Sequence, residues 1–341
     1  MERMRSGGGW KEESNEKICG LYVVGSSLNG FGSDSSDADM CLMLTEEQVD
    51  QRQHARMILS HASRCIARTG WCLGGRPQLI QAKVPILRFR DSPSGGVEVD
   101  LNVNNAVGLR NTHLLQCYAR LDPRVGPLAL AVKAWARAHG INDAKNGTLS
   151  SYSVALMIVQ YLQYGCKPPV LPCLQKMQPV SVRPFPAWAI GKETVSVATG
   201  TCGLLRLGED PPQWRSENSQ SLGALFAGFV DFYANRFSFS RSVVCVRLGE
   251  PLSRSQAQAH HVPGCGRTQW KYVCIEEPFD QTNTARSVYD WDAFQLIVHA
   301  FHDTLQALES SHEPDCLMLP GLGSSPRGGW SPTFLRGPPV V

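Results

Sequence analysis

The chain has 341 residues, enough for two domains with separate cores, and its hydrophobic content of 43% is typical of a globular protein. No apolar run reaches the ~20 residues of a membrane-spanning helix, and the N-terminal stretch lacks the apolar core of a secretion signal, so we expect neither membrane insertion nor secretion. A net charge of only +3 excludes a large basic field, so this chain alone should bind nucleic acid weakly.

The first patterned stretch is 21–44, which follows a polar, Gly-rich segment. A short apolar run ends at Gly25 and Ser26, a loop of small residues follows, and Asp37 and Asp39 open a second apolar run. The pattern predicts a strand, a turn with a helix N-terminus, a loop and another strand. Because strand side chains alternate between faces, Asp37 and Asp39 point the same way and repel each other unless a cation lies between them.

This stretch offers ligands of two kinds. Carboxylate oxygens suit a hard ion such as Mg²⁺, and the turn at Gly25 and Ser26 can offer backbone N–H groups and a hydroxyl to phosphates. An Asp-x-Asp pair alone is usually a solvated turn, and a Gly-Ser loop alone is weak evidence. Their combination between two apolar runs favours a phosphate cradle beside a metal site, and so indicates nucleotidyl transfer.

A helix is predicted next, from Thr45 as its N-cap to about Ala67, and then two strands at 83–89 and 97–103. In the second strand, apolar side chains that face the core alternate with polar ones on the other face: Val97, Val99, Leu101 and Val103 against Glu98, Asp100 and Asn102. An acid on the outer face of a strand is normally just solvated. Beside a pair of carboxylates that lacks a third ligand, however, Asp100 is the natural completion of the site.

Beyond these strands the sequence becomes helical. Lys133 and Arg137 lie one turn apart on an apolar helix, and on the residues alone they read as ordinary surface charge. The segment 147–153 leads into an apolar helix at 154–162, with a Ser as its cap. Many Pro residues interrupt 167–220, which predicts a long irregular connection.

Two further helices are predicted near 222–237 and at 291–308, each with an apolar face. Between them, 272–280 reads as a strand that runs into a turn. The two ends of the chain, 1–17 and 311–341, are rich in polar residues and Gly or Pro and are predicted to be disordered.

The Gly-Ser pair followed by Asp-x-Asp resembles the signature of the DNA-polymerase-beta-like nucleotidyltransferases. A longer match narrows the family: 25–44, 100–118, 147–162 and 275–286 together resemble the cytoplasmic poly(A) RNA polymerases of the GLD-two type. The resemblance implies an α+β fold. In it, a small mixed-sheet nucleotidyltransferase catalytic domain packs on a mainly helical PAP-associated domain, with the nucleotide in the cleft between them.

On this resemblance we divide the chain into an atypical N-terminal segment (1–17), the catalytic domain (18–120), the helical domain (121–310) and a tail (311–341). Residues 187–210 match nothing in the family and are interpreted as an insertion. Family members carry helical sequence before the first catalytic strand, where this chain has a Gly-rich stretch. A truncated, inactive paralogue that acts as a binding scaffold is therefore the rival hypothesis.

The resemblance also implies a role for each site residue. The catalytic carboxylates and ligands of Mg²⁺ or Mn²⁺ are Asp37, Asp39 and Asp100. The nucleotide-binding residues are Gly25, Ser26, Asn105, Thr112, Lys133, Ser151 and Tyr152. Among them, Ser26 and Lys133 hold the triphosphate, and Asn105 and Thr112 contact the ribose. Ser151 approaches phosphate, Tyr152 stacks on the base, and Arg137 is a second phosphate-binding position. The loop that selects the base contains Glu277, Asp280, Asn283 and Arg286.

Uridylyl-adding relatives carry a His in this loop, whereas here the loop is shortened, lacks His and contains Asn283. We therefore expect ATP to be preferred over UTP. The resemblance predicts a template-independent RNA adenylyltransferase, a poly(A) polymerase that adds AMP from ATP to RNA 3′ ends by a two-metal mechanism. A terminal uridylyltransferase is the alternative among enzymes.

The sequence contains no recognisable RRM-like, KH-like or zinc-finger module for RNA binding. Because the net charge is also low, we expect an RNA-binding protein partner to recruit the chain to its substrate, an RNA 3′ end, while ATP is the second substrate. Twelve Cys residues occur without a C-x-x-C pair, which favours free thiols in a reducing compartment. The expected location is the cytoplasm, with the nucleus as a second location.

Overall fold

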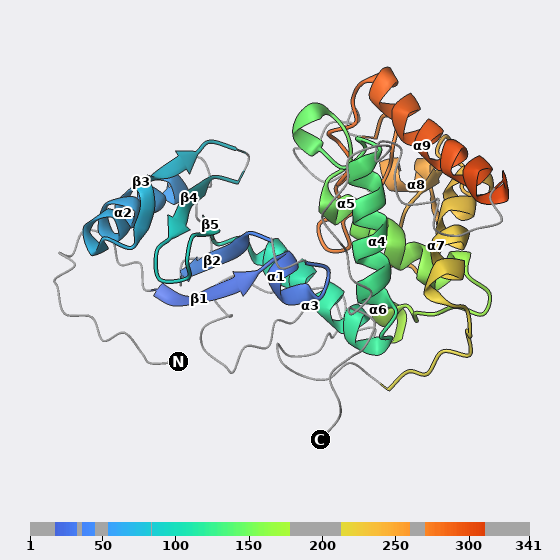
Figure 1. Cartoon of the computed structure of the whole chain (residues 1–341), viewed down its shortest axis with the longest axis horizontal. Coiled ribbons are helices and arrows are strands. Elements are labelled where there is room, and N and C mark those ends of the chain that lie inside the picture. Colours follow the sequence, from blue (N-terminus) through green and yellow to red (C-terminus); the bar gives the residue numbers. More distant parts are fainter. Residues whose placement is uncertain are drawn as a thin grey trace, which may run out of the picture.

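Two lobes make up the part of the chain that the computed structural model describes, residues 18–32, 36–44, 54–82, 84–177, 213–259 and 270–310 (Figure 1). One lobe is built on a sheet and the other is mainly helical, which confirms the predicted α+β fold class. Four sequence-based expectations lie outside the described residues: the disordered ends at 1–17 and 311–341, the N-cap at Thr45 and the insertion at 187–210.

The smaller lobe contains a mixed five-stranded sheet. Its elements in chain order are β1 (Ile18–Val24), α1 (Ser26–Asn29), β2 (Ala38–Leu44), α2 (His54–Thr69), β3 (Cys72–Ile80), β4 (Ile86–Asp91), β5 (Val97–Val103) and α3 (Ala106–Leu121). The strands are ordered β1-β2-β5-β4-β3. Only β2 and β5 pair in parallel, and all other neighbours pair antiparallel. The strand that carries Asp100 therefore lies between the strand of Asp39 and β4.

The two faces of this sheet are covered by different helices. Leu59 of α2 packs on one face against Leu87, Leu101 and Val103, and Leu109 of α3 packs on the other against the β1–β2 pair. The predicted alternation of β5 thus places Leu101 and Val103 in a core. The prediction is wrong for Val97, which opens the strand directly after a turn and is 40% exposed.

Strand β3 is absent from the sequence-based prediction. Its stretch contains Gly74, Gly75 and Pro77, which normally argue against a strand. The structure accommodates them because β3 is an edge strand, and its pairing with β4 is irregular between Leu73 and Gln78.

The larger lobe is mainly helical. Its elements are α4 (Val125–Ala138), the 3₁₀ turn η1 (Ala144–Asn146), α5 (Ser151–Gln160), the π-helical turn η2 (Tyr161–Gly165), α6 (Leu174–Met177), α7 (Leu222–Asp231), the π-helical turn η4 (Phe232–Arg236), β6 (Ser242–Val243), β7 (Leu252–Ser253), α8 (Arg254–Ala259) and α9 (Trp291–Ser310). The helices predicted at 154–162, 222–237 and 291–308 are confirmed as α5 with η2, α7 with η4, and α9.

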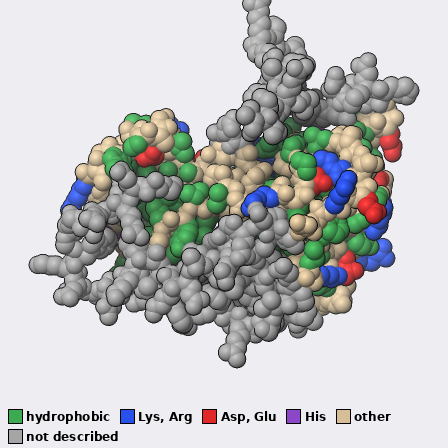
Figure 2. Space-filling model, turned by 90° about the horizontal axis from the view of Figure 1, so that it is seen from below, with side chains coloured by type: hydrophobic (Ala, Val, Ile, Leu, Met, Phe, Trp, Pro, Cys, Tyr) green, Lys and Arg blue, Asp and Glu red, His purple; other side chains and the backbone are tan. Residues whose placement is uncertain are grey.

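An aromatic core holds these helices together. Trp135 of α4, Phe229 of α7 and Phe301 of α9 lie within ring contact of one another, with centroid separations of 4.9 to 6.3 Å. None of the helices in the described ranges is both long and apolar enough to cross a membrane. On the face drawn in Figure 2, Lys and Arg side chains of the helical lobe are interspersed with Asp and Glu, as the net charge of +3 leads one to expect.

Candidate active site

Two of the predicted carboxylates lie side by side on parallel strands. Asp39 of β2 is the register partner of Asp100 of β5, so the two side chains project from the same face of the sheet. Asp37 precedes β2 and is exposed, whereas Asp100 is only 8% exposed. The structure therefore brings together carboxylates that are about 60 residues apart in the chain, as the sequence led us to expect.

The surroundings of Asp39 disfavour its ionised form. The pKa of Asp39 is raised to about 6, mainly by burial and in addition by the nearby charges of Asp100 and Asp37, while the charge of Arg88 opposes the shift. A cation bound beside Asp39 would stabilise its ionised form, which the neighbouring carboxylates disfavour. The cluster has the electrostatic character of a cation-binding site.

Arg88 of β4 is a site residue that the sequence analysis missed. Its guanidinium binds both oxygens of Asp100, with Nε 2.8 Å from Oδ1 and Nη2 2.7 Å from Oδ2. The Arg88 Nε atom also lies 3.0 Å from Oε1 of Glu98. Among the described residues, no three His, Cys, Asp or Glu side chains converge closely enough to hold a metal ion. Arg88 is the register partner of Asp100 in the pairing of β4 with β5, which the period of the side chains along each strand does not reveal.

The Gly25 turn lies directly against Asp39. Gly25 has φ +78°, and a Cβ atom placed there would overlap Oδ2 of Asp39, so both the backbone and the neighbour require glycine. The Gly25 N–H donates to Oγ1 of Thr112 over 2.8 Å, and that hydroxyl donates to the Gly108 carbonyl over 2.7 Å. The predicted phosphate turn is therefore fixed on α3 and placed beside the carboxylates.

Asn105 and Thr112, predicted to contact the ribose, bind backbone groups in the structure. Asn105 caps α3, because its Oδ1 atom accepts the Gly108 N–H over 3.1 Å. Thr112 is 5% exposed and holds the Gly25 turn. Both residues thus position the start of α3 against the turn, and a ribose contact stays a prediction.

Lys133 reaches from the helical lobe to the sheet lobe. Its Nζ atom donates to the Phe31 carbonyl, just after α1, over 2.8 Å. Burial lowers the pKa of Lys133, and the charge of Arg137 one turn away lowers it further. Gly32 follows Phe31 and lies against the Ser26 carbonyl, where a Cβ atom would overlap it. Lys133 is therefore close in the fold to the Ser26 turn, as a triphosphate ligand should be.

Ser151 and Tyr152 begin α5. Ser150 provides the helix cap, accepting the Ser153 N–H over 3.0 Å, which leaves the exposed Ser151 hydroxyl to donate to Asn142 over 3.2 Å. The Tyr152 hydroxyl donates to Oε1 of Glu277 over 3.2 Å. This bond joins the predicted base-stacking ring to the predicted base-selection loop, 125 residues away in the chain.

Glu277 is a buried acid at the base of that loop. It is 4% exposed, and its Oε2 atom accepts the N–H groups of Phe279 and Asp280. Burial raises the pKa of Glu277 to about 8, with the charge of Asp280 as a second cause and the two N–H groups opposing. Asp280 in turn accepts from the N–H and the hydroxyl of Thr282 over 2.9 and 2.7 Å.

Asn283 lies inside the loop. It is 1% exposed; its Oδ1 atom accepts the N–H groups of Ile275 and Ala285, and its Nδ2 atom donates to the Val273 carbonyl. Asn283 therefore shapes the loop through the backbone and does not offer its oxygen to a base. Arg286, which follows, is exposed.

Replacing Glu277 by Gln tests the charge of this loop. The pKa of Glu277 in the folded protein, about 8, exceeds the ordinary value of 4.5, so its neutral form contributes stability that is complete below pH 4.5 and is lost as the pH rises through 8. The Gln side chain cannot ionise, and its oxygen can accept both N–H groups. Between pH 5 and pH 9 we expect the unfolding free energy of the wild type to fall by about 2–4 kcal/mol relative to Glu277→Gln in urea titrations.

The matched control is Glu250→Gln, in which the replaced carboxylate forms an exposed ion pair with Lys176. This variant should follow the wild type within about 0.5 kcal/mol over the same pH range. A Glu277→Gln difference that does not change with pH would contradict the buried, neutral carboxyl group.

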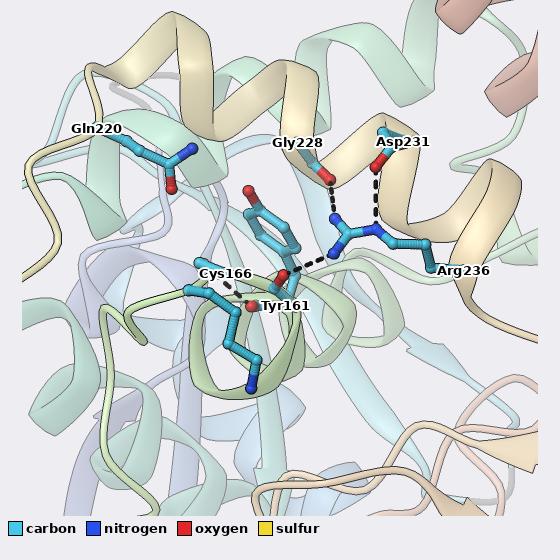
Figure 3. A pocket seen from close by; sticks show the side chains of 8 residues that line it. Tyr161, Cys166, Gln220, Gly228, Asp231 and Arg236 are labelled. Atoms are coloured by element: carbon cyan, nitrogen blue, oxygen red, sulfur yellow. Dashed lines mark hydrogen bonds and ion pairs between the residues drawn. The ribbon is translucent and has the colours of Figure 1, made fainter.

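The pocket in Figure 3 contains none of the predicted site residues. It has a volume of about 420 Å³ and is lined by Tyr161, Gly165, Cys166, Lys167, Gln220, Gly228, Asp231 and Arg236. The Arg236 guanidinium is already held by the Asp231 carboxylate and by the carbonyls of Gly165 and Gly228. The lining of the pocket therefore includes none of the three predicted catalytic carboxylates, Asp37, Asp39 and Asp100.

Family models match both lobes. Residues 12–120 match the model described as "Poly(A) RNA polymerase, mitochondrial-like, central palm domain", and residues 221–283 match "Cid1 family poly A polymerase". The chain is 44% identical over 301 residues to the poly(A) RNA polymerase GLD2 of Mus musculus, covering 86% of this chain and 57% of that protein. It is 43% identical over 293 residues to the gld-2 homolog A of Drosophila melanogaster, covering 86% and 20%. The chain thus spans less than two thirds of these curated relatives.

Solved structures agree with the sequence matches. A chain in the structure of the GLD-2/RNP-8 complex is 40% identical, with a TM-score of 0.67 and coverage of 88% of this chain and 85% of that one. A structure of a mutant of the Cid1 poly(U) polymerase bound to MgATP is 29% identical, with a TM-score of 0.67 and coverage of 88% of this chain and 86% of that one. The chain belongs to the GLD2 family of poly(A) RNA polymerases.

Proposed function

We propose that the chain is a template-independent RNA adenylyltransferase, which adds AMP from ATP to RNA 3′ ends. The observation that carries the proposal is the placement of Asp39 opposite Asp100, directly against the Gly25 turn, in a chain of the GLD2 family. Family membership supplies the reaction class, and the site supplies the groups that such a reaction needs.

The residues present fit a divalent cation, Mg²⁺ or Mn²⁺. All three donors, Asp37, Asp39 and Asp100, are carboxylates, which hard cations prefer. Burial, and after it the charges of Asp100 and Asp37, raises the pKa of Asp39, and a bound cation would favour its ionised form. When bound, such a cation supplies positive charge to the attacking oxygen and to the triphosphate. The MgATP-bound Cid1 poly(U) polymerase supports this assignment.

The chemistry then needs positioned groups in the chain. In the proposed reaction, the RNA 3′-oxygen forms a bond to the α-phosphorus of ATP as the bond to pyrophosphate breaks, and the hydroxyl proton passes to the Asp100 carboxylate. The Gly25 turn, Ser26 and Lys133 hold the triphosphate, Tyr152 lies under the base, and Ser151 approaches phosphate. Positioning and electrostatics account for most of the rate, because no covalent intermediate is required.

Base choice is a separate part of the proposal. The loop of Glu277, Asp280, Asn283 and Arg286 contains no His, and Glu277 contacts the ring on which the base would stack. With ATP and UTP at equal concentration, we expect labelled AMP to be incorporated at least about tenfold faster than UMP on an RNA primer. Equal or faster incorporation of UMP would instead establish a uridylyltransferase.

The solved complex of GLD-2 with RNP-8 supports a protein partner for this chain. The low net charge of the chain and the mixed charges on the face in Figure 2 favour a partner that contributes RNA binding. The cytoplasm, with the nucleus as a second location, is the proposed site of action. The eight cysteines whose side chains the structure describes are all free thiols, which fits a reducing compartment.

A further inference from the structure

Arg88 lies between two acids of the central strand. Glu98 and Asp100 are two residues apart on β5 and project from the same face, and Arg88 of β4 faces them both. The Arg88 Nε atom is 2.8 Å from Oδ1 of Asp100 and 3.0 Å from Oε1 of Glu98, so it already contacts both partners. Its Nη2 atom binds Asp100 alone, at 2.7 Å.

Asp100 lies between Arg88 on one neighbouring strand and Asp39 on the other. Because β5 lies between β4 and β2, Asp100 faces Arg88 across one strand pairing and Asp39 across the other. Both oxygens of Asp100 bind Arg88, and no three acidic, His or Cys side chains in the described ranges converge as metal ligands. A cation shared by Asp39 and Asp100 competes with the Arg88 guanidinium for the Asp100 oxygens and repels its positive charge, which favours release of at least one Arg88 donor.

Breaking a bidentate, partly buried pair is costly unless the released donor finds another acceptor. Glu98 is that acceptor, since its carboxylate already contacts Arg88 and its side chain is 28% exposed. We propose that Arg88 shifts from Asp100 to Glu98 when a divalent cation binds, so that Arg88 and Glu98 are positioning residues that set the affinity of the carboxylates for the cation. The inference rests on the proposed function, because it assumes that Asp39 and Asp100 bind a cation.

A double-mutant cycle separates this exchange from simple electrostatics. Glu98→Gln keeps an acceptor oxygen but removes the negative charge that would hold Arg88, so we expect it to weaken Mn²⁺ binding by about tenfold. Arg88→Gln frees Asp100 and should tighten binding by about threefold or more. In the Arg88→Gln background, Glu98→Gln should then change the affinity by less than about twofold, since no Arg88 remains to relocate.

The measurement is the free Mn²⁺ signal in electron paramagnetic resonance, recorded on the full chain without nucleotide, with thermal unfolding of each variant alongside. Asp39→Asn identifies the carboxylate site, and its failure to change Mn²⁺ binding would overturn the proposed function itself. If binding depends on Asp39 but Glu98→Gln weakens it equally in both backgrounds, only the exchange is overturned.

Arg88→Lys provides a second test that does not depend on the folding of Arg88→Gln. Lys keeps the positive charge but cannot bind both Asp100 oxygens in a fork. The exchange predicts tighter Mn²⁺ binding than in the wild type, by about twofold or more, because the competing pair is weaker. Unchanged or weaker binding in Arg88→Lys, with the fold intact, would contradict it.

Discussion

Replacing Asp100 by Asn is expected to slow AMP addition by at least about 10³-fold, the largest effect that we predict for a side chain. Asn has nearly the same size, so β5 and its packing should persist, and Arg88 retains Glu98 as a partner. What is lost is the negative charge opposite Asp39 and the acceptor for the primer proton. The expected defect is therefore in the chemical step, with little change in the affinity for RNA.

The measurement is the single-turnover rate of primer extension at saturating ATP. Asp303→Asn, which removes an exposed acid of α9, is the matched control and should retain the wild-type rate. An Asp100→Asn variant that kept more than about a tenth of the wild-type rate would show that this carboxylate is not part of the reaction.

Replacing Gly25 by Ala is expected to cost about 1–3 kcal/mol of unfolding free energy and to slow extension by about 10²-fold or more. The positive φ of +78° strains any residue other than glycine, and the new methyl group would overlap the Asp39 carboxylate. The strain lowers stability, whereas the overlap displaces the Asp39 carboxylate, to which we assign a catalytic role.

Gly70→Ala separates these two effects. Gly70 has φ +72°, but a Cβ atom there meets nothing within 4 Å. It should therefore lose about 1 kcal/mol of stability in urea titrations and keep the wild-type rate. If both variants lost activity equally, contact of Gly25 with Asp39 would not explain the defect.

The alternation of side chains explains why the carboxylates were predictable. A period of two places Asp37 with Asp39, and Asp100 opposite the apolar side chains of its strand, whatever the sheet topology. Strand pairing is not visible in that period, so neither the parallel register of Asp39 with Asp100 nor the pairing of Arg88 with Asp100 could be derived.

Local sequence patterns did not predict the structure in three other places, because the tertiary surroundings decide it there. The Gly and Pro residues of β3 argue against a strand in the sequence, but an edge strand tolerates these residues whereas a central strand does not. Val97 looks like a core residue, but it is the first residue of β5 and is 40% exposed. The sequence places Asn283 in the base-selection loop but does not reveal that its amide binds the backbone of that loop. The helices α5, α7 and α9 were predictable because their apolar faces follow the helical period directly.

The most direct test of adenylyl transfer is extension of a labelled RNA primer by the full chain with Mg²⁺ and each nucleoside triphosphate separately, beside Asp39→Asn. We expect a ladder of added residues with ATP that is lost in the variant. A soluble, cooperatively folded wild-type chain that extends the primer with none of the four nucleotides would contradict the proposed activity and favour a binding scaffold.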